Sequence, residues 1–149
     1  MREIKFRGKR VDNGGWVYGY FLYSAVLDEH VIWTDHDYWI VVPESVGQYT
    51  GLHDNTKWDD LIKQEQHQWL QKGKTQEDWK GKEIYEGDIV AGKRDSHWHG
   101  GYDIVRGKVY FSDSHSSFHV DGDGCLYYVE EIEVIGNIYE HPELLEEAQ

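Results

Sequence analysis

Nine histidines are the side chains in this sequence whose chemistry depends most on their spacing. His97 and His99 flank a tryptophan and would lie on one side of an extended segment, whereas His115 and His119 are four residues apart. If the two segments met, these imidazoles could bind Zn²⁺ or Ni²⁺. However, a spacing of four aligns two ligands only on a helix, and the glycine, serine and aspartate around His97 and His99 favour an exposed loop. We therefore predict no metal site, although His97, His99, His115 and His119 are the candidates for one.

Arrangements for covalent catalysis or cofactor binding are not evident in the sequence. Cys125 follows a glycine in an expected hairpin, and no neighbouring residue type would activate its thiolate. The sequence has no nucleophile elbow, no phosphate-binding loop and no dinucleotide fingerprint. Because the chain contains 28 Asp and Glu residues, a pair at the separation used by glycosidases carries no information. The sequence therefore predicts no cofactor and favours a protein that is not an enzyme.

The balance of charges indicates which partners are unfavourable. The chain has 15 Lys and Arg residues against 28 Asp and Glu residues, and its net charge of −13 repels the phosphates of nucleic acids. Five of the basic residues lie within residues 1–10, where they form either a solvated strand face or a docking surface for an acidic neighbour. If this segment docks on a partner, we expect aromatic side chains to supply most of the binding affinity. The expected interaction surface comprises Arg2, Lys5, Arg7, Lys9, Trp16, Tyr18 and Trp69.

Length and cysteine content indicate the general class of protein. A chain of 149 residues fits one domain, residues 1–149, that can bury a core without metal or disulfide. The single cysteine excludes an internal disulfide, and the sequence shows neither a leader nor a long apolar run. We therefore expect a cytoplasmic protein without contact with a membrane.

The hydrophobic pattern predicts a mainly β fold. Apolar and charged residues alternate at the start of the chain, and a turn at Asn13, Gly14 and Gly15 precedes an apolar strand over residues 16–24. Further strands are expected over residues 31–33, 38–42, 89–93, 104–111, 118–120, 126–129 and 132–138.

Residues 54–80 differ from the rest because they lose β-branched residues and gain Gln, Lys, Glu and Asp. We predict a helical insert here, with its principal helix inside residues 56–73 and Gly73 in the left-handed position after the helix. A short helix with so narrow an apolar stripe is marginal alone, so we expect Trp69 to pack on the barrel or on another subunit. The insert is then either an arm that recognises a partner or a lid over a gap in the sheet.

Four segments carry a resemblance to a known family. They are Met1 to Arg7, Gly47-Gln48-Tyr49-Thr50-Gly51-Leu52, the stretch from Gly81 to Val90, and Ile132 to Glu140. With these segments the chain resembles the YopX family of small phage and prophage proteins over nearly its whole length. The resemblance implies an all-β pseudobarrel and a bacterial host cell, but no activity. The glycines around Gly87 and Gly107 also resemble the opening of small SH3-like barrels.

Three functions from different classes are compatible with these observations. The first is a non-enzymatic phage accessory protein that binds another protein, beginning with another copy of itself, and possible partners include a host or phage protein. The second is an acidic decoy that occupies a host DNA-binding protein by imitating phosphate charge. The third is a small enzyme or ligand-binding barrel with a cleft of histidines or carboxylates. We favour the first.

Overall fold

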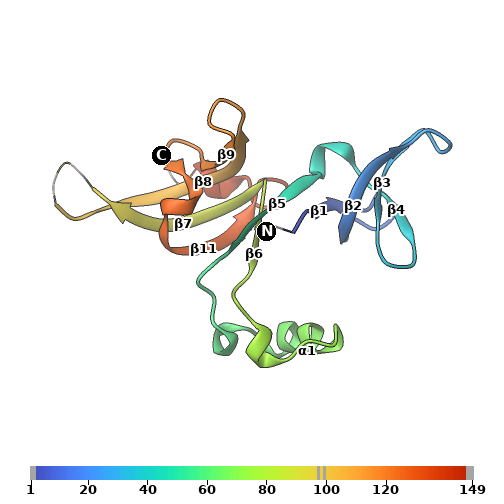
Figure 1. Ribbon diagram of the computed structural model, residues 1–149, viewed down its shortest axis with the longest axis horizontal. Coiled ribbons are helices and arrows are strands. Elements are labelled where there is room, and N and C mark those ends of the chain that lie inside the picture. Colours follow the sequence, from blue (N-terminus) through green and yellow to red (C-terminus); the bar gives the residue numbers. More distant parts are fainter. Residues whose placement is uncertain (1–2, 97, 99, 147–149) are drawn as a thin grey trace.

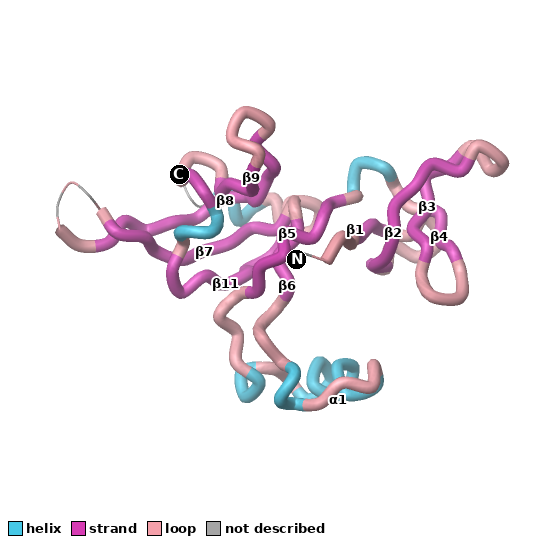
Figure 2. Tube along the Cα trace, in the orientation of Figure 1, coloured by secondary structure: helices cyan, strands magenta, loops and turns pink. Residues whose placement is uncertain are grey.

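The computed structural model describes residues 3–96, 98 and 100–146 of the chain. Three lobes meet at its centre (Figure 1): a sheet of N-terminal strands, a sheet that contains most of the C-terminal half, and a helical lobe. Figure 2 shows that two connecting segments join the helical lobe to the sheets. The prediction of a mainly β fold is confirmed.

The first sheet has six antiparallel strands in the order β4-β3-β2-β1-β5-β6. These strands are β1 (Phe6–Lys9), β2 (Trp16–Ser24), β3 (Glu29–Trp33), β4 (Tyr38–Ile40), β5 (Gly47–His53) and β6 (Glu83–Tyr85). A bridge between Arg10 and Val41 curls the outer strands back toward β1. The curl places Gly8 against a small core, where an added Cβ would lie 3.1 Å from Ile32 Cδ1 and 3.2 Å from Val41 Cβ.

The second sheet has five antiparallel strands in the order β10-β9-β8-β7-β11. Its strands are β7 (Asp88–Asp95), β8 (Tyr102–Ser112), β9 (Ser117–Val120), β10 (Gly124–Cys125) and β11 (Glu130–Asn137). Val105 and Val109 of β8 lie on one face of that strand and point into the main hydrophobic core, and Val90 of β7 is opposite Gly107 between them. This core consists of Ile84, Val90, Val105, Val109, Phe118, Val120, Leu126, Val129 and Ile132.

The two sheets do not form a closed barrel. They are joined at the tight turn between β6 and β7, where Gly87 donates its backbone N–H to Val109 O (2.9 Å) and accepts the N–H of Ile138 (2.8 Å). Gly87 has φ +91°, and an added Cβ would meet the Tyr139 ring at 2.9 Å, so only glycine fits this junction.

One expected strand, residues 126–129, is wrong. Leu126–Tyr128 instead form a 3₁₀ turn closed by a hydrogen bond from Val129 N to Leu126 O (3.1 Å). The strand β10 (Gly124–Cys125) ends just before this turn, and the turn places the Leu126 side chain in the core. A short apolar run does not distinguish these two outcomes.

The helical lobe confirms the helical insert within residues 54–80. It contains α1 (Lys63–Gln71) between the 3₁₀ turns Trp58–Asp60 and Gln76–Asp78, and Gly73 has the expected positive φ of +80°. A second short helix, α2 (Glu143–Glu146), follows β11. Neither helix in the described part of the chain is long and apolar enough to cross a membrane.

Candidate functional site

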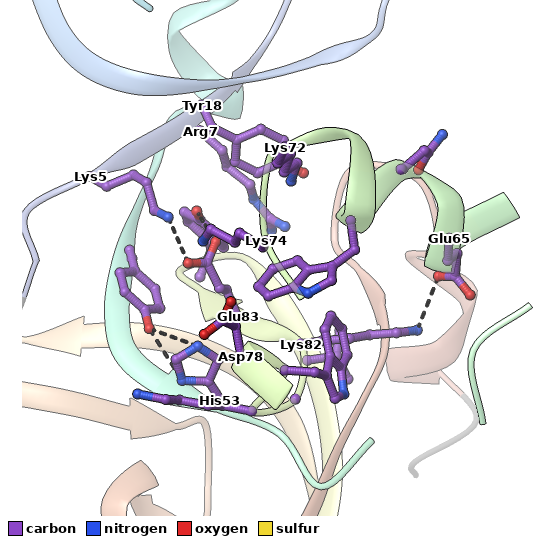
Figure 3. Close-up of a pocket in the computed structure, with 18 of the residues that line it drawn as sticks. Lys5, Arg7, Tyr18, His53, Glu65, Lys72, Lys74, Asp78, Lys82 and Glu83 are labelled. Carbon is purple, nitrogen blue, oxygen red and sulfur yellow. Dashed lines mark hydrogen bonds and ion pairs between the residues drawn. The ribbon is translucent and has the colours of Figure 1, made fainter. Parts of the chain in front are cut away.

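A hollow of the described surface lies between the helical lobe and the first sheet (Figure 3), and we call it the cleft. It encloses about 830 Å³, in the upper part of the range of about 300–1,000 Å³ that is usual for ligand sites. One wall comes from β1, β2, β5 and β6, and the other from α1 and the segment that follows it. The insert therefore forms the roof of the cleft.

A row of three tyrosines forms the wall on the side of the sheet. The ring centroid of Tyr85 lies 5.6 Å from that of Tyr18 and 5.4 Å from that of Tyr49. Tyr49 and Tyr85 are opposite each other on β5 and β6, so their side chains share one face of the sheet. Burial and the nearby Glu83 raise the pKa of Tyr49 to about 12, and burial also raises the pKa of Tyr85. Both phenols are therefore hydrogen-bond donors at neutral pH.

Glu83 organises the polar groups at the centre of this wall. Its Oε2 accepts a hydrogen bond from Lys5 Nζ (2.6 Å), and its Oε1 accepts one from the Tyr85 hydroxyl (2.9 Å). Next to it, the hydroxyl of Tyr49 lies 3.3 Å from His53 Nε2. Burial lowers the pKa of His53, so its imidazole is neutral at pH 7. These hydrogen bonds restrict the positions of the polar groups on this wall.

A buried ion pair lies at the base of the cleft. Arg7 Nη2 is 2.7 Å from Asp88 Oδ1, and the two side chains are only 8% and 2% exposed. Burial raises the pKa of Asp88, and the guanidinium of Arg7 opposes that rise. The guanidinium also lies over the rings of Trp16 (4.6 Å) and Tyr85 (5.0 Å). Its Nε has no hydrogen-bond partner within the described part of the chain.

The roof is held by three tryptophans of the insert. The Trp79 ring makes edge contacts with Trp69 (5.1 Å) and Trp58 (6.3 Å). Trp69 Nε1 donates a hydrogen bond to Thr75 O (2.8 Å), and Trp79 Nε1 donates one to Thr56 O (2.9 Å). The insert therefore has its own small aromatic core. Trp69 packs against Trp79 inside this core and not on the sheets, because Trp79 lies close enough in the chain to cover it. The alternative expectation, contact of Trp69 with another subunit, stays a prediction.

The segments that carry the family resemblance meet beside this cleft. Gln48 of β5 donates its N–H to Glu86 Oε1 (3.0 Å) and accepts the N–H of Glu86 (3.0 Å). Gly47 lies so close to the same turn that an added Cβ would be 2.4 Å from Glu86 O. Since β1 pairs with β5 and β11 pairs with β7, all four segments contribute to one junction.

A family model described as YopX protein matches residues 5–146. The chain belongs to the YopX family. No curated protein and no solved structure matches it.

The neck of the insert depends on a residue that the sequence reasoning missed. Asp54 is 4% exposed and accepts four hydrogen bonds: two from Thr56, one from the N–H of Lys82 and one from the N–H of Val134. Gly81 lies against it, because an added Cβ would be 2.1 Å from Asp54 O. Asp54 thus ties both connecting segments of this YopX chain to β11. The sequence does not indicate that Asp54 is buried, because it is an acidic residue at the start of a polar segment.

The basic groups expected at an interaction surface are mostly paired within the YopX chain itself. Lys5 contacts Glu83, Arg7 is buried against Asp88, and Lys9 Nζ lies 3.8 Å from Glu140 Oε1. The expected exposure of Arg7 is therefore wrong, because a carboxylate far away in the sequence draws it inward. Arg2 lies outside the described residues.

The aromatic members of the expected surface have different surroundings. Trp16 donates its Nε1–H to Glu140 Oε1 (2.5 Å), whereas Tyr18 is 45% exposed at the edge of the cleft. Trp69 lines the cleft from the roof. A docking role for any of the expected residues stays a prediction.

The candidate metal ligands do not form a site in the described part of the chain. His115 and His119 have ring centroids 4.8 Å apart, but their nitrogens contact the hydroxyls of Ser112 (2.9 Å from His115 Nδ1) and Ser117 (3.1 Å from His119 Nε2). Groups of three or more potential ligands are absent from the described residues. His97 and His99 lie outside those residues.

Proposed function

We propose that this YopX chain is a non-enzymatic phage or prophage accessory protein that acts by binding proteins, and that its first partner is another copy of itself. The observation that supports this proposal is an uncharged apolar surface on the first sheet. We call it the aromatic face, and it consists of Tyr18, Tyr20, Leu22, Trp33 and Tyr38.

The strand register places these side chains together. Tyr20 is opposite Trp33, and Trp33 is opposite Tyr38, so all three lie on one face of β2, β3 and β4. The ring centroids of Trp33 and Tyr38 are 5.4 Å apart. Tyr18 and Leu22 flank Tyr20 on the same face because side chains alternate along β2. Tyr20 is 69% exposed and the other four are 39–45% exposed.

Contiguous exposed aromatic side chains are typical of protein interfaces, where tyrosine and tryptophan supply much of the binding energy. Two copies of a chain with a net charge of −13 repel each other over most orientations. The five side chains of the aromatic face are uncharged at neutral pH, so contact through them adds no repulsion of their own. The geometry therefore favours contact between two aromatic faces. Salt screens the repulsion between the two acidic copies only in part.

The test is the mass of the protein in solution, measured by light scattering across a concentration series. We expect the wild-type chain to form a dimer and the variant Tyr20→Ser/Trp33→Ser to be monomeric with an unchanged circular dichroism spectrum. Tyr127→Ser/Tyr128→Ser is the matched control, because these two tyrosines are 71% and 69% exposed in the 3₁₀ turn between β10 and β11, away from the aromatic face. A monomeric wild type, or equal loss of the dimer in the control, would show that the aromatic face is not an interface between copies.

A further inference from the structure

Three lysines on the roof of the cleft, Lys72, Lys74 and Lys80, are exposed and make no ion pair with the described residues. By contrast, Lys5, Arg7 and Lys82, which also line the cleft, each have a carboxylate within 4 Å. Among the residues that the structure describes, six basic and five acidic side chains line the cleft, whereas the sequence has 15 basic and 28 acidic residues. It is therefore a local exception on a strongly acidic surface.

The cleft also offers apolar surface on two sides. On the side of the sheet this surface comes from Tyr18, which is 45% exposed, because Tyr49 and Tyr85 are only 4% and 2% exposed. On the side of the roof it comes from Trp69 and Trp79. Lys74 Nζ lies 4.6 Å from the centroid of the Trp69 ring, so a positive charge and an aromatic surface are side by side. The indole hydrogen bonds of the roof and the Asp54 neck hold these groups in place, which lowers the entropy lost on binding.

We propose that the cleft binds an acidic linear segment of a partner protein. Carboxylates of the segment contact Lys72, Lys74 and Lys80, and an aromatic or aliphatic side chain inserts between Tyr18 and Trp69. This site does not depend on self-association, and only Tyr18 is shared with the aromatic face.

Charge complementarity favours a peptide over a single-stranded nucleic acid. A nucleic acid carries a phosphate at every residue and would bring several of them close to Glu3, Asp78 and Glu83 in the cleft. A peptide with two or three carboxylates matches the three unpaired lysines, and its uncharged backbone can pass these acidic groups. Its amide N–H groups are also suitable donors to Glu83.

The test uses a library of short random-sequence peptides on beads, which is incubated with the full-length protein. We expect the selected peptides to be enriched in Asp and Glu together with one aromatic or aliphatic residue. The consensus peptide should bind at least about tenfold more tightly than its Asn and Gln counterpart, and binding should shift the indole N–H resonances of Trp69 and Trp79.

Two charge-reversal variants distinguish the cleft from the rest of the insert. Lys72→Glu/Lys74→Glu/Lys80→Glu should lose the enrichment for acidic peptides and weaken the consensus peptide at least about tenfold. Lys57→Glu/Lys63→Glu changes two exposed lysines of the same insert that do not line the cleft, and it should bind nearly as the wild type does. A library without acidic enrichment, an equal loss in both variants, or tighter binding of oligothymidylate than of the consensus peptide would overturn the proposal.

Discussion

Replacing Asp54 by asparagine tests whether one carboxylate attaches the helical lobe to the sheets. Asp54 Oδ1 accepts the N–H groups of Thr56 (2.9 Å) and Lys82 (2.8 Å), and Oδ2 accepts the Thr56 hydroxyl (2.9 Å) and the N–H of Val134 (3.0 Å). An asparagine keeps one acceptor oxygen, but its NH₂ group would face the N–H of Val134, donor against donor. The substitution therefore leaves at least one backbone N–H of this half-buried neck without its acceptor.

The expected cost follows from these contacts. A hydrogen bond to a charged group contributes about 1.5–3 kcal/mol, so Asp54→Asn should lower the free energy of unfolding by about 2 kcal/mol. Asp54→Ala removes the acceptor of three backbone N–H groups, and partial entry of water limits the loss to about 3–4 kcal/mol. Both substitutions should destabilise the two connecting segments of the insert before they destabilise the sheets.

Urea unfolding measures the total loss, and amide hydrogen exchange locates it. We expect faster exchange at Val134 and Lys82 in both variants. Asp59→Asn is the control, because Asp59 is an exposed acidic residue of the same insert, and surface changes of this kind stay within about 0.5 kcal/mol. If Asp54→Asn cost no more than this control, or if exchange at Val134 were unchanged, the role assigned to Asp54 would be refuted.

Three further predictions concern the base of the cleft, the pH dependence and the insert. Asp88→Asn leaves the buried guanidinium of Arg7 without its counter-charge and should lower the free energy of unfolding by about 3–5 kcal/mol, whereas adding Arg7→Met should recover part of that loss in a double-mutant cycle. The indole hydrogen bond from Trp16 lowers the pKa of Glu140, so the stabilisation from this contact is present above the ordinary pKa of glutamate and is lost as the pH falls through the lowered pKa. Trp16→Phe should therefore raise the pH midpoint at which the Glu140 carboxyl resonance titrates. An unchanged midpoint would contradict this cause. Replacing residues 57–79 by a short glycine-serine link should preserve a cooperative thermal transition because the insert has its own core, and loss of that transition would show that the sheets need the insert.

The features that the sequence predicts well are local ones. Strand β2 spans Trp16–Ser24 as expected because its turn residues and apolar run lie next to each other in the chain. The helix inside residues 56–73 and the positive φ of Gly73 follow from composition and from the chemistry of helix ends.

The features that the sequence could not predict involve partners far apart in the chain. Arg7 is buried only because Asp88 neutralises it, and an alternating pattern around Arg7 contains no information about that partner. Asp54 similarly accepts the N–H of Val134 from β11. For the same reason the pattern predicted neither the two aromatic walls of the cleft nor which lysines on its roof lack an ion pair.

The self-contained core of the insert has a consequence for the order of folding. Strands β5 and β6 pair through Tyr49 and Tyr85, and the chain between them must close a long loop before that pairing contributes any stability. The contacts among Trp58, Trp69 and Trp79 are local and form within that loop. Because topologies rich in local contacts form fastest, the insert should fold first and bring its two ends together. The loop that remains is then short, so β5 and β6 meet with little further loss of chain entropy, and the insert acts as a nucleus for the sheet from which it projects.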